Sequence, residues 1–466
     1  MNYFPCFINL DNKKVLFVGA GKIAVRKIFF LIKMNAQIIV VSRKISNNLI
    51  KLHREKKIDW IDTNFFENQL KKIFLVIVAT DNNSLNKYIY EKTKQKKILV
   101  NVVDDRSKCT FIFPSIVERF PIIVAVSSGG TAPVLTKMIK EKIESTLPMN
   151  LGKSALLAQK WRSHVKLKFK KSIYRRHFWE KIFEGMFVNH VLNGNFKKAI
   201  KVLNNEIKRK KVIKGEISLV GAGPGDGGLL TLKGLQVIQK ADVVLYDNLV
   251  SSEILSLIRK DAKKIYVGKE AKKLCISQEE INLILIKMAK KGKKVVRLKG
   301  GDPFIFGRGG EELEVAKKFK INFQVIPGIT SAIGVSSYAG IPLTHRNYSS
   351  GIIIINGCKK NEIEGKQNWK SISRLKNYTI VIYMPRLQST YIFDELKAND
   401  YPLDMPIALI EQGTTLNQKT VIGIFKNLKS LLFLMKSPTL LILGKVVSLS
   451  KNLSWFKSDT NQNSLL

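Results

Sequence analysis

The sequence predicts an α/β protein built from two α/β halves that are joined by a basic, mostly helical segment. At 466 residues the chain is too long for one compact core and suits roughly two to four domains. Hydrophobic residues make up 45% of it, which excludes wholesale disorder. In both halves short apolar runs alternate with amphipathic stretches, as strands and helices do when they follow one another.

Residues 1–113 predict a doubly wound, Rossmann-like sheet. Helical patterns, the first from Lys22 to Met34, separate four apolar runs: KKVLFVGAG, AQIIVVS, FLVIVATD and KKILVNVVDD. Each run is almost continuously apolar, as a parallel strand covered by helices on both faces requires. Each run also ends in glycine or polar residues, where the chain turns toward the next helix.

Residues 114–148 predict an appendage to this sheet. They hold two β-rich runs, interrupted by Pro114 and Pro121, and then a helical pattern. We expect this segment to serve dimerisation.

Residues 149–210 are mostly helical in pattern and strongly basic. Between residues 151 and 215 there are 18 Lys and Arg against 3 Asp and Glu. The charged run near residues 204–216 has little apolar content and predicts an exposed linker. We therefore expect the second α/β domain to occupy residues 216–450.

The second domain predicts two α/β lobes. Its apolar runs are ISLVGAGPGD, ADVVLYD, KKIYVGK, KKVVRLKGGDP and FQVIPGIT, followed by GIIIING, YTIVIYMP, PIALIEQGT and PTLLILGK. Many of them end in glycine or polar residues. Because ligands of open α/β sheets bind at the carboxyl ends of the strands, we expect a binding crevice there.

The formal net charge of +43 is typical of proteins that bind nucleic acid, an anionic membrane or a polyanionic ligand. A composition rich in Lys, Asn and Ile produces the same charge without any partner. No nucleic-acid-binding motif accompanies it, and no apolar stretch approaches the roughly 18 residues of a membrane-spanning helix. We expect neither a nucleic-acid nor a membrane partner.

Cysteines and histidines predict no disulfide framework and no resident metal. The four cysteines include no C-x-x-C pair, and the five histidines lack the spacing of metal ligands. The start MNYFPCFINLDNKK has no basic stretch followed by an apolar one, so no export signal is expected. A reducing cytoplasm fits these features.

The run GAGKIA at residues 19–24 predicts a dinucleotide-binding turn, because it follows a strand and opens a helix. Gly19 permits the tight turn, Gly21 lets the backbone approach a pyrophosphate, and Ala24 allows close packing of helix and strand. The alternative is a tight turn that binds nothing.

The acidic residue that usually follows about 20 positions later and binds the ribose hydroxyls is missing. The second strand ends instead at Ser42, Arg43 and Lys44. Two cations favour a 2′-phosphate and hence NADP, whereas contacts from Ser42 and the backbone would suit NAD equally well.

Asp104 and Asp105 end the strand KKILVNVV, at the edge where ligands collect. A carboxylate there can accept a proton from a substrate that loses hydride, although a solvated turn or a helix cap is the alternative. The run SSGGT predicts a flexible turn before a helix, with Ser128 as a donor or cap.

The run GAGPGDGGLLT also follows a strand, but Pro224 removes an N–H and stiffens the loop. We expect a flat or zwitterionic ligand there rather than a pyrophosphate. At other strand ends, Asp247 and Lys269 are candidates for an acid–base pair, with surface salt bridges as the alternative.

With both halves in view, the chain resembles the siroheme synthase family, which fuses a precorrin-2 dehydrogenase and sirohydrochlorin ferrochelatase to a uroporphyrinogen-III C-methyltransferase. The methyltransferase signatures are similar to VGAGPGD, GLLTLKGL, VVRLKGGDPFIFGRGGEE, PGIT and GIPLTHR. The dehydrogenase and chelatase module is similar to VGAGKIAVRK, VATD, NVVD, PSIVER and AVSSGGTAPVL. The resemblance covers nearly the whole chain and implies modules at residues 1–203 and 216–450.

The resemblance also implies residue roles. Asp104 would serve both dehydrogenation and iron insertion, Asp247 would accept a proton, Lys269 would donate one, and Ser128 matches a serine that is phosphorylated in relatives. NAD contacts are implied at Lys22, Ile23, Arg43 and Lys44, beside the turn glycines Gly19 and Gly21. S-adenosylmethionine contacts are implied at Pro224, Gly300, Gly301, Asp302, Ile305, Thr330, Ser331, Met384 and Gly413.

Two positions depart from the family pattern. Lys22 stands where an acidic or small polar residue is common, and Pro385 follows Met384 where glycine is usual. Neither change abolishes its motif.

The resemblance implies three activities on one chain: methylation of uroporphyrinogen III at C-2 and C-7 to precorrin-2, NAD-dependent oxidation to sirohydrochlorin, and insertion of Fe²⁺ as a substrate to give siroheme. It also implies a homodimer. The substrate carries several carboxylates, so it is a plausible partner for the basic segment. The alternatives are a methyltransferase with a degenerate first half, or a nucleic-acid-binding protein that uses residues 151–215.

Overall fold

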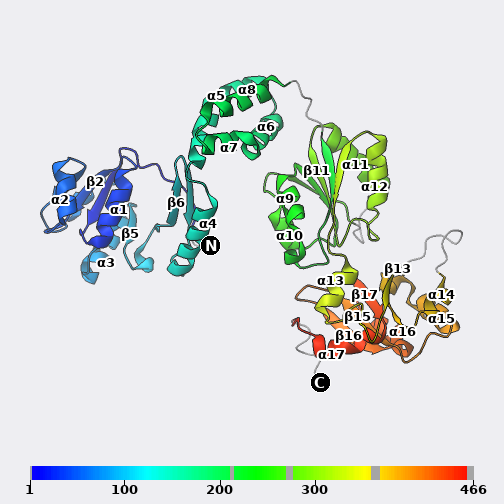
Figure 1. Ribbon diagram of the computed structural model, residues 1–466. Coiled ribbons are helices and arrows are strands. Elements are labelled where there is room, and N and C mark those ends of the chain that lie inside the picture. Colours follow the sequence, from blue (N-terminus) through cyan, green and yellow to red (C-terminus); the bar gives the residue numbers. More distant parts are fainter. Residues whose placement is uncertain (1–2, 210–214, 269–275, 358–367, 459–466) are drawn as a thin grey trace. The chain divides into compact units, whose positions relative to one another are not determined.

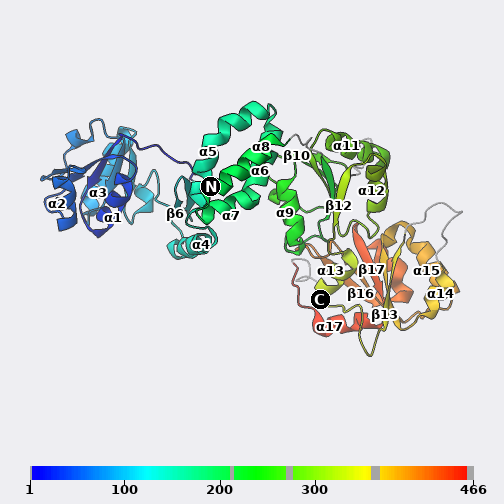
Figure 2. The same cartoon turned by 45° about the horizontal axis from the view of Figure 1, so that its top comes forward.

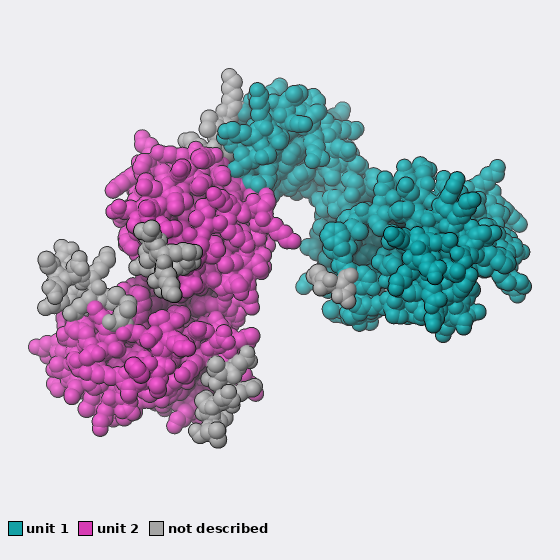
Figure 3. Space-filling model, turned by 180° about the vertical axis from the view of Figure 1, so that it is seen from behind, with its two compact units in different colours: residues 1–210 teal, residues 211–466 magenta. Residues whose placement is uncertain are grey.

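The computed structural model describes four stretches of the chain: residues 3–209, 215–268, 276–357 and 368–458. It divides into two compact units, unit 1 with residues 1–210 and unit 2 with residues 211–466 (Figure 3). Each unit has hydrophobic cores of its own. Among the described helices none is both long enough and apolar enough to cross a membrane.

Unit 1 begins with a parallel sheet in the strand order β3-β2-β1-β4-β5 (Figure 1). The strands are β1 (Lys14–Val18), β2 (Gln37–Val41), β3 (Ile58–Ile61), β4 (Leu75–Val78) and β5 (Leu99–Val102). The helices are α1 (Lys22–Ile32), α2 (Asn47–Arg54) and α3 (Asn83–Gln95). Phe17 of β1 shares a core with Ile28 of α1, whereas its neighbour Leu16 shares another core with Ile89 of α3. Both faces are covered, which confirms the predicted doubly wound sheet.

An antiparallel hairpin follows, made of β6 (Ser115–Arg119) and β7 (Ile122–Val126), and then α4 (Pro133–Thr146). The buried side chain of Arg119 joins the hairpin to the end of this helix. Its Nε donates to the carbonyl oxygen of Leu147 at 3.0 Å and its Nη2 to that of Glu144 at 3.1 Å. These bonds satisfy carbonyl groups that a helix leaves free at its C-terminus.

The basic segment forms four helices that pack on one another (Figure 2). They are α5 (Leu151–Lys168), α6 (Ser172–Glu184), α7 (Met186–Leu192) and α8 (Phe196–Lys208). Their shared core includes Val165, Phe178, Phe187 and Leu203. The Lys and Arg side chains of the basic segment therefore belong to a folded set of helices with an apolar core.

Unit 2 begins with a second parallel sheet, in the order β10-β9-β11-β8-β12. Its strands are β8 (Glu216–Gly221), β9 (Val243–Tyr246), β10 (Lys263–Tyr266), β11 (Lys294–Lys299) and β12 (Asn322–Ile326). Its helices are α9 (Leu232–Lys240), α10 (Ser252–Leu257), α11 (Gln278–Lys290) and α12 (Gly309–Lys318). Leu219 of β8 packs in the core with α11, and Val220 packs in the core with α9. This sheet too is covered on both faces.

The second lobe of unit 2 is a mixed sheet in the order β13-β14-β17-β15-β16, in which only β13 and β14 pair in parallel. Its strands are β13 (Gly351–Asn356), β14 (Tyr378–Tyr383), β15 (Pro406–Glu411), β16 (Lys419–Ile424) and β17 (Thr439–Leu443). Its helices are α13 (Ser331–Tyr338), α14 (Trp369–Arg374), α15 (Ser389–Ala398), α16 (Leu428–Phe433) and α17 (Ser450–Leu453). The two-lobed α/β arrangement is confirmed.

Three details differ from the sequence-based expectations. The edge strands β3 and β16 were not predicted, because an edge strand with one solvated face lacks the continuous apolar run that marks a central strand. The prediction of a linker near residues 204–216 is wrong at its start, because α8 continues to Lys208. Ile207 packs against the helical core and extends the helix.

Candidate functional site

The glycine turn after β1 opens the first candidate site. Gly19 has a φ of +93°, and a Cβ there would lie 2.3 Å from the carbonyl oxygen of Ala79, so the turn requires glycine. A Cβ at Gly21 would meet no atom within 4 Å, so this side of the turn is open. Helix α1 starts at Lys22 and Ile23 without a side-chain cap. The N–H groups of its first turn therefore lack a capping side chain, and such groups can bind an anion.

The end of β2 lies beside this turn. Gly19 donates its N–H to the carbonyl oxygen of Val41 at 3.0 Å. The hydroxyl of Ser42 donates to the carbonyl oxygen of Lys44 at 2.8 Å, while the side chains of Arg43 and Lys44 are exposed. The turn therefore has a positively charged neighbour.

Asp104 and Asp105 follow β5, and their carboxylates have different surroundings. Hydrogen bonds from Lys108 and Ser107 lower the pKa of Asp105 to about 2, and its carboxylate caps the short 3-10 turn Arg106–Lys108. Asp104 is exposed, has a φ of +63°, and receives no hydrogen bond from any residue that the structure describes. A left-handed conformation at a residue other than glycine is uncommon and marks a strained turn. Asp104 is the carboxylate that remains available to a ligand.

The SSGGT turn lies against the turn after β5. A Cβ on Gly130 would lie 3.3 Å from Cδ of Arg106, and one on Gly129 would lie 3.7 Å from its Nη2. The hydroxyl oxygen of Ser128, just before α4, accepts a hydrogen bond from the N–H of Ala132 at 2.9 Å. The two motifs that the sequence separates by some 20 residues thus meet at one place.

Lys27 of α1 was not singled out by the sequence analysis. Its Nζ lies 3.5 Å from the ring centroid of Phe113, and the side chain is half-buried. Burial lowers the pKa of Lys27 to about 8, although electrostatic attraction to Cys109 and Asp104 opposes the shift. A desolvated amine beside a candidate catalytic carboxylate is typical of functional sites.

The second candidate site lies where β8, β11 and β12 end. Gly223 donates its N–H to the carbonyl oxygen of Gly301 at 3.1 Å, and Gly301 donates back at 2.7 Å. A Cβ on Gly221 would lie 2.5 Å from Cα of Gly328. The Oδ2 of Asp302 accepts the N–H of Gly328 at 3.0 Å. Three of the strand ends that were expected to converge therefore touch.

The second lobe adjoins these loops through hydroxyl groups. The N–H of Asp226 donates to Oγ1 of Thr414 at 3.1 Å. The hydroxyls of Thr330 and Tyr383 share a hydrogen bond of 2.6 Å, and the N–H of Ala332 donates to the Tyr383 oxygen at 2.7 Å. Burial raises the pKa of Tyr383. We call the meeting of the loops after β8, β11, β12, β14 and β15 the loop junction.

Glycines let the backbone of the loop junction lie directly against neighbouring side chains. A Cβ on Gly334 would lie 2.6 Å from Cγ of Pro224, and one on Gly225 would lie 2.8 Å from Oγ1 of Thr414. A Cβ on Gly413 would lie 2.5 Å from both methyl carbons of Val335. Only glycine fits at these contacts.

The expected S-adenosylmethionine contacts lie around this junction. Gly300, Gly301, Asp302 and Ile305 are in the loop after β11, and Thr330 and Ser331 are at the start of α13. The N–H of Ser331 would lie 3.8 Å from a Cβ on Gly301. Met384, with a φ of +51°, directly follows β14, and Pro385 then begins a 3-10 turn where proline is tolerated. These residues were predicted from resemblance, and their roles stay predictions.

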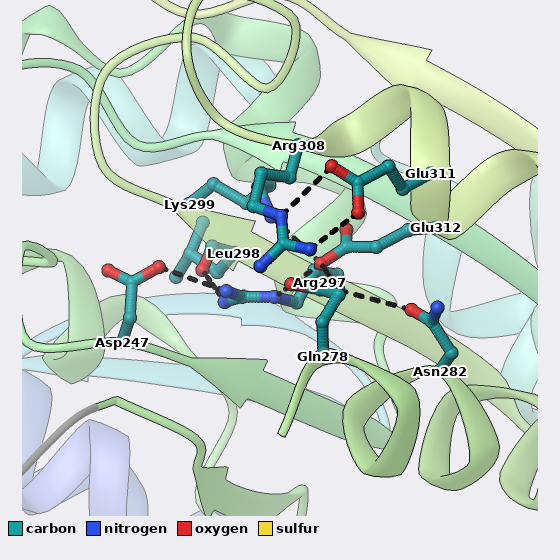
Figure 4. A network of polar contacts seen from close by, with 9 residues as sticks. All are labelled: Asp247, Gln278, Asn282, Arg297, Leu298, Lys299, Arg308, Glu311 and Glu312. Carbon is teal, nitrogen blue, oxygen red and sulfur yellow. Dashed lines mark hydrogen bonds and ion pairs between the residues drawn. The ribbon is translucent and has the colours of Figure 1, made fainter. Parts of the chain in front are cut away.

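Asp247 follows β9 and is half-buried. Its Oδ1 accepts the N–H of Leu249 at 3.1 Å, and its Oδ2 accepts Nη2 of Arg297 at 3.1 Å (Figure 4). A Cβ on Gly300 would lie 2.5 Å from Cβ of Leu249, so the Asp247 loop lies against the loop after β11. Lys269, the expected proton donor, lies outside the described residues.

Tyr383, Arg297 and Lys27 were not predicted as site residues from the sequence. Tyr383 is the last residue of an apolar strand, and a hydroxyl at that place is the signal that points to it. Arg297 lies inside a strand, where a charged residue among apolar neighbours indicates a buried ion pair. Within the described stretches no three His, Cys, Asp or Glu side chains form a group that could hold a metal ion.

Four family models match the chain. They are described as tetrapyrrole (corrin/porphyrin) methylases at residues 216–429, NAD(P)-binding at 6–115, sirohaem biosynthesis protein central at 119–146, and sirohaem synthase dimerisation region at 150–207. The dimerisation description covers the helices that we expected to bind tetrapyrrole, whereas we expected the dimer contact in residues 114–148.

Similar proteins extend over the whole chain. The siroheme synthase of Buchnera aphidicola is 52% identical over 98% of this chain and 97% of its own length. That of Actinobacillus pleuropneumoniae is 47% identical over 99% of this chain and 95% of its own. Among solved structures, a uroporphyrin III C-methyl transferase from Thermus thermophilus is 36% identical, covers 50% of this chain and 99% of its own, and gives a TM-score of 0.44.

Proposed function

Because this chain belongs to the siroheme synthase family, we propose that it carries out the whole conversion of uroporphyrinogen III to siroheme, including the insertion of Fe²⁺. It is a multifunctional enzyme of siroheme biosynthesis with a methyltransferase and a dehydrogenase domain. Iron insertion is the step that goes beyond those domains. The observation that carries the proposal is that each unit has a carboxylate, Asp104 or Asp247, after a parallel strand and near a glycine turn.

We assign methyl transfer to the loop junction. S-adenosylmethionine supplies an electrophilic methyl group when it is bound, and the reaction depends chiefly on positioning. The atoms nearest to a Cβ on Gly301 would belong to Ser331 and Thr330, at 3.8 to 3.9 Å, so no clash closes off this backbone to a ligand. Both oxygens of Asp302 already accept N–H groups, from Phe304 and Gly328, so Asp302 acts by holding its loop in shape. Asp247 then accepts the proton that the methylated substrate loses.

We assign the oxidation of precorrin-2 to the turn after β1. NAD accepts a hydride when it is bound. The open side of Gly21 and the uncapped start of α1 suit its pyrophosphate, and Arg43 and Lys44 contribute positive charge beside it. Asp104 accepts the proton that precorrin-2 loses together with the hydride.

Iron insertion uses the same carboxylate. The two pyrrole N–H protons of sirohydrochlorin must leave as Fe²⁺ enters the ring. The exposed Asp104, which has no hydrogen-bond donor among the described residues, is free to accept them. One strained turn would thus serve two consecutive reactions.

The tetrapyrrole partners are polyanions, and the basic helices α5–α8 offer them positive charge. We propose a homodimer that uses the segment matched as a dimerisation region. The thiols of Cys6 and Cys109 are free, which suits a reducing compartment such as the cytoplasm. Ser128, beside the turn after β5, is the proposed phosphorylation site, where a phosphate would repel an anionic substrate.

A stepwise assay tests the proposed function. Purified protein receives uroporphyrinogen III and S-adenosylmethionine, then NAD, then Fe²⁺, while the absorption spectrum is followed. We expect precorrin-2, sirohydrochlorin and siroheme in turn. A reaction that stops at precorrin-2 would show a methyltransferase whose first half is degenerate.

The shared role of Asp104 is tested by Asp104→Ala, with Asp105→Asn as the matched control from the same turn. Asp104→Ala should leave methylation unchanged and reduce both oxidation and iron insertion by at least about 100-fold, the usual contribution of an acid–base group. Asp105→Asn should change either step by less than about threefold, because Asp105 only caps the turn. Iron insertion at the wild-type rate in Asp104→Ala would contradict the shared carboxylate.

A further inference from the structure

We propose that Arg297 is the positioning residue of the Asp247 carboxylate, and that the buried side chains of Glu312 and Lys299 hold Arg297 in place for that task. The inference rests on the proposed role of Asp247 in methyl transfer. It concerns three residues to which neither the motifs nor the comparisons assign a role.

The guanidinium of Arg297 is fixed in three directions. Nη2 donates to Oδ2 of Asp247 at 3.1 Å, Nε lies 3.3 Å from Oε1 of Glu312, and Nη1 donates to the carbonyl oxygen of Leu298 at 2.8 Å. Its side chain is only 6% exposed. A planar guanidinium with three separate acceptors cannot rotate, so its contact with Asp247 has one geometry (Figure 4).

Glu312 connects Arg297 to a second cation. Its side chain is fully buried, and Oε1 also accepts Nζ of Lys299 at 2.8 Å and Nε2 of Gln278 at 3.1 Å. Its Oε2 is buried without a hydrogen-bond partner among the described residues. Burial lowers the pKa of Lys299, because this place disfavours charge.

Stability alone does not account for this cluster. Buried ion pairs typically add little or nothing to the free energy of folding compared with apolar residues of similar size. This one includes a carboxylate oxygen that has no partner in the part of the chain that the structure describes, which is an additional cost. The network runs from α12 through β11 and ends at the half-buried carboxylate of Asp247 (Figure 4). Of the two half-buried side chains that the network reaches, Gln278 and Asp247, only Asp247 is a carboxylate, and it is the proposed proton acceptor.

The arrangement fixes the plane of the carboxylate. One oxygen of Asp247 is held by the N–H of Leu249 and the other by Arg297, so the remaining lone pairs point in set directions. Methyl transfer forms a bond from a pyrrole carbon to the methyl group, breaks the sulfur–methyl bond, and is completed when the substrate loses a proton to this carboxylate. A base that is displaced by about 1 Å loses much of its effect, of the order of 100-fold in rate.

The test uses Arg297→Lys in the full chain, which keeps the charge and removes the planar fork. We expect kcat for methylation of uroporphyrinogen III to fall by about 30-fold or more, with KM for S-adenosylmethionine and the affinity for S-adenosylhomocysteine unchanged within about twofold. Glu312→Gln, which keeps the shape, should lower kcat by a smaller factor. Single-turnover assays at high enzyme concentration keep slow variants measurable.

A double-mutant cycle separates positioning from a structural role. In the Asp247→Asn background, Arg297→Lys should lower the rate by no more than about twofold further, because Arg297 acts through Asp247. Arg259→Lys is the matched control, since Arg259 pairs with Asp242 at 2.9 Å just before β9, at the opposite end of that strand. It should leave kcat unchanged.

Three results would overturn the inference: a wild-type kcat in Arg297→Lys, a full loss that persists in the Asp247→Asn background, or a loss of S-adenosylhomocysteine binding equal to the loss of kcat. Failure of the proposed function is a different result, because the wild-type protein itself would then not methylate uroporphyrinogen III.

Discussion

At the scale of single residues, Lys27 is the clearest departure from ordinary chemistry in unit 1. Burial lowers the pKa of its amine to about 8, against 10.5 for an unperturbed lysine. In a fraction of the molecules the Lys27 amine is therefore uncharged near neutral pH. It lies close to Asp104 and over the ring of Phe113. The amine can exchange protons there, which an ordinary surface lysine does rarely at this pH.

This shift has a consequence for stability. Between pH 8 and 10.5 the unfolded chain keeps the proton on Lys27 while the folded chain has lost it, so the unfolded state binds more protons and stability rises with pH. We expect the free energy of unfolding of the wild type, relative to Lys27→Met, to increase by about 1–2 kcal/mol across this range, after allowance for partial exposure to solvent.

Denaturant unfolding of both proteins at several pH values measures this difference. Lys33→Met is a suitable control, because the side chain of Lys33 is 63% exposed. A wild-type advantage that stays flat with pH, or falls, would contradict the lowered pKa.

At the scale of elements, the turn between β1 and α1 holds two glycines with different tasks. We expect Gly19 to matter for folding and Gly21 for binding of NAD. Gly19→Ala places a Cβ against the carbonyl of Ala79 at a positive φ and should destabilise unit 1 by about 2–4 kcal/mol. Gly21→Ala meets no protein atom within 4 Å and should cost less than about 1 kcal/mol. It should still weaken NAD binding by about tenfold or more, because the methyl group fills the space that a pyrophosphate approaches.

Thermal unfolding and NAD titration of the two variants distinguish these effects. Equal loss of stability in both, or unchanged NAD affinity in Gly21→Ala, would contradict the assignment of the turn.

The elements also show what the sequence can reveal. Central strands such as β1 and β8 were predictable, because burial on both faces leaves a continuous apolar run. The glycine turns and Asp104 were predictable from their places at strand ends. Edge strands and the last turns of α8 were not, since their apolar residues are few and their packing is tertiary. The role of Arg297 could not be predicted, because its ion-pair partners Asp247 and Glu312 are remote in sequence.

At the scale of the whole molecule, the two units have separate cores, and each carries one of the candidate sites. Ligands should therefore stabilise the units independently. At about 100 times its dissociation constant a ligand adds about 2.7 kcal/mol to the unit that binds it.

Differential scanning calorimetry tests this independence. We expect two transitions, with NAD raising one midpoint and S-adenosylhomocysteine the other. A single transition that both ligands raise together would show that the units unfold as one.

The glycine contacts of the loop junction have a consequence for motion. Where Gly334 meets the ring of Pro224 and Gly225 meets the hydroxyl of Thr414, the glycine backbone lies directly against a side chain of the other lobe. Such close contacts resist sliding, so we expect the two lobes of unit 2 to move together rather than to open about a hinge. On this expectation, cofactor and product enter and leave through movements of individual side chains and loop tips.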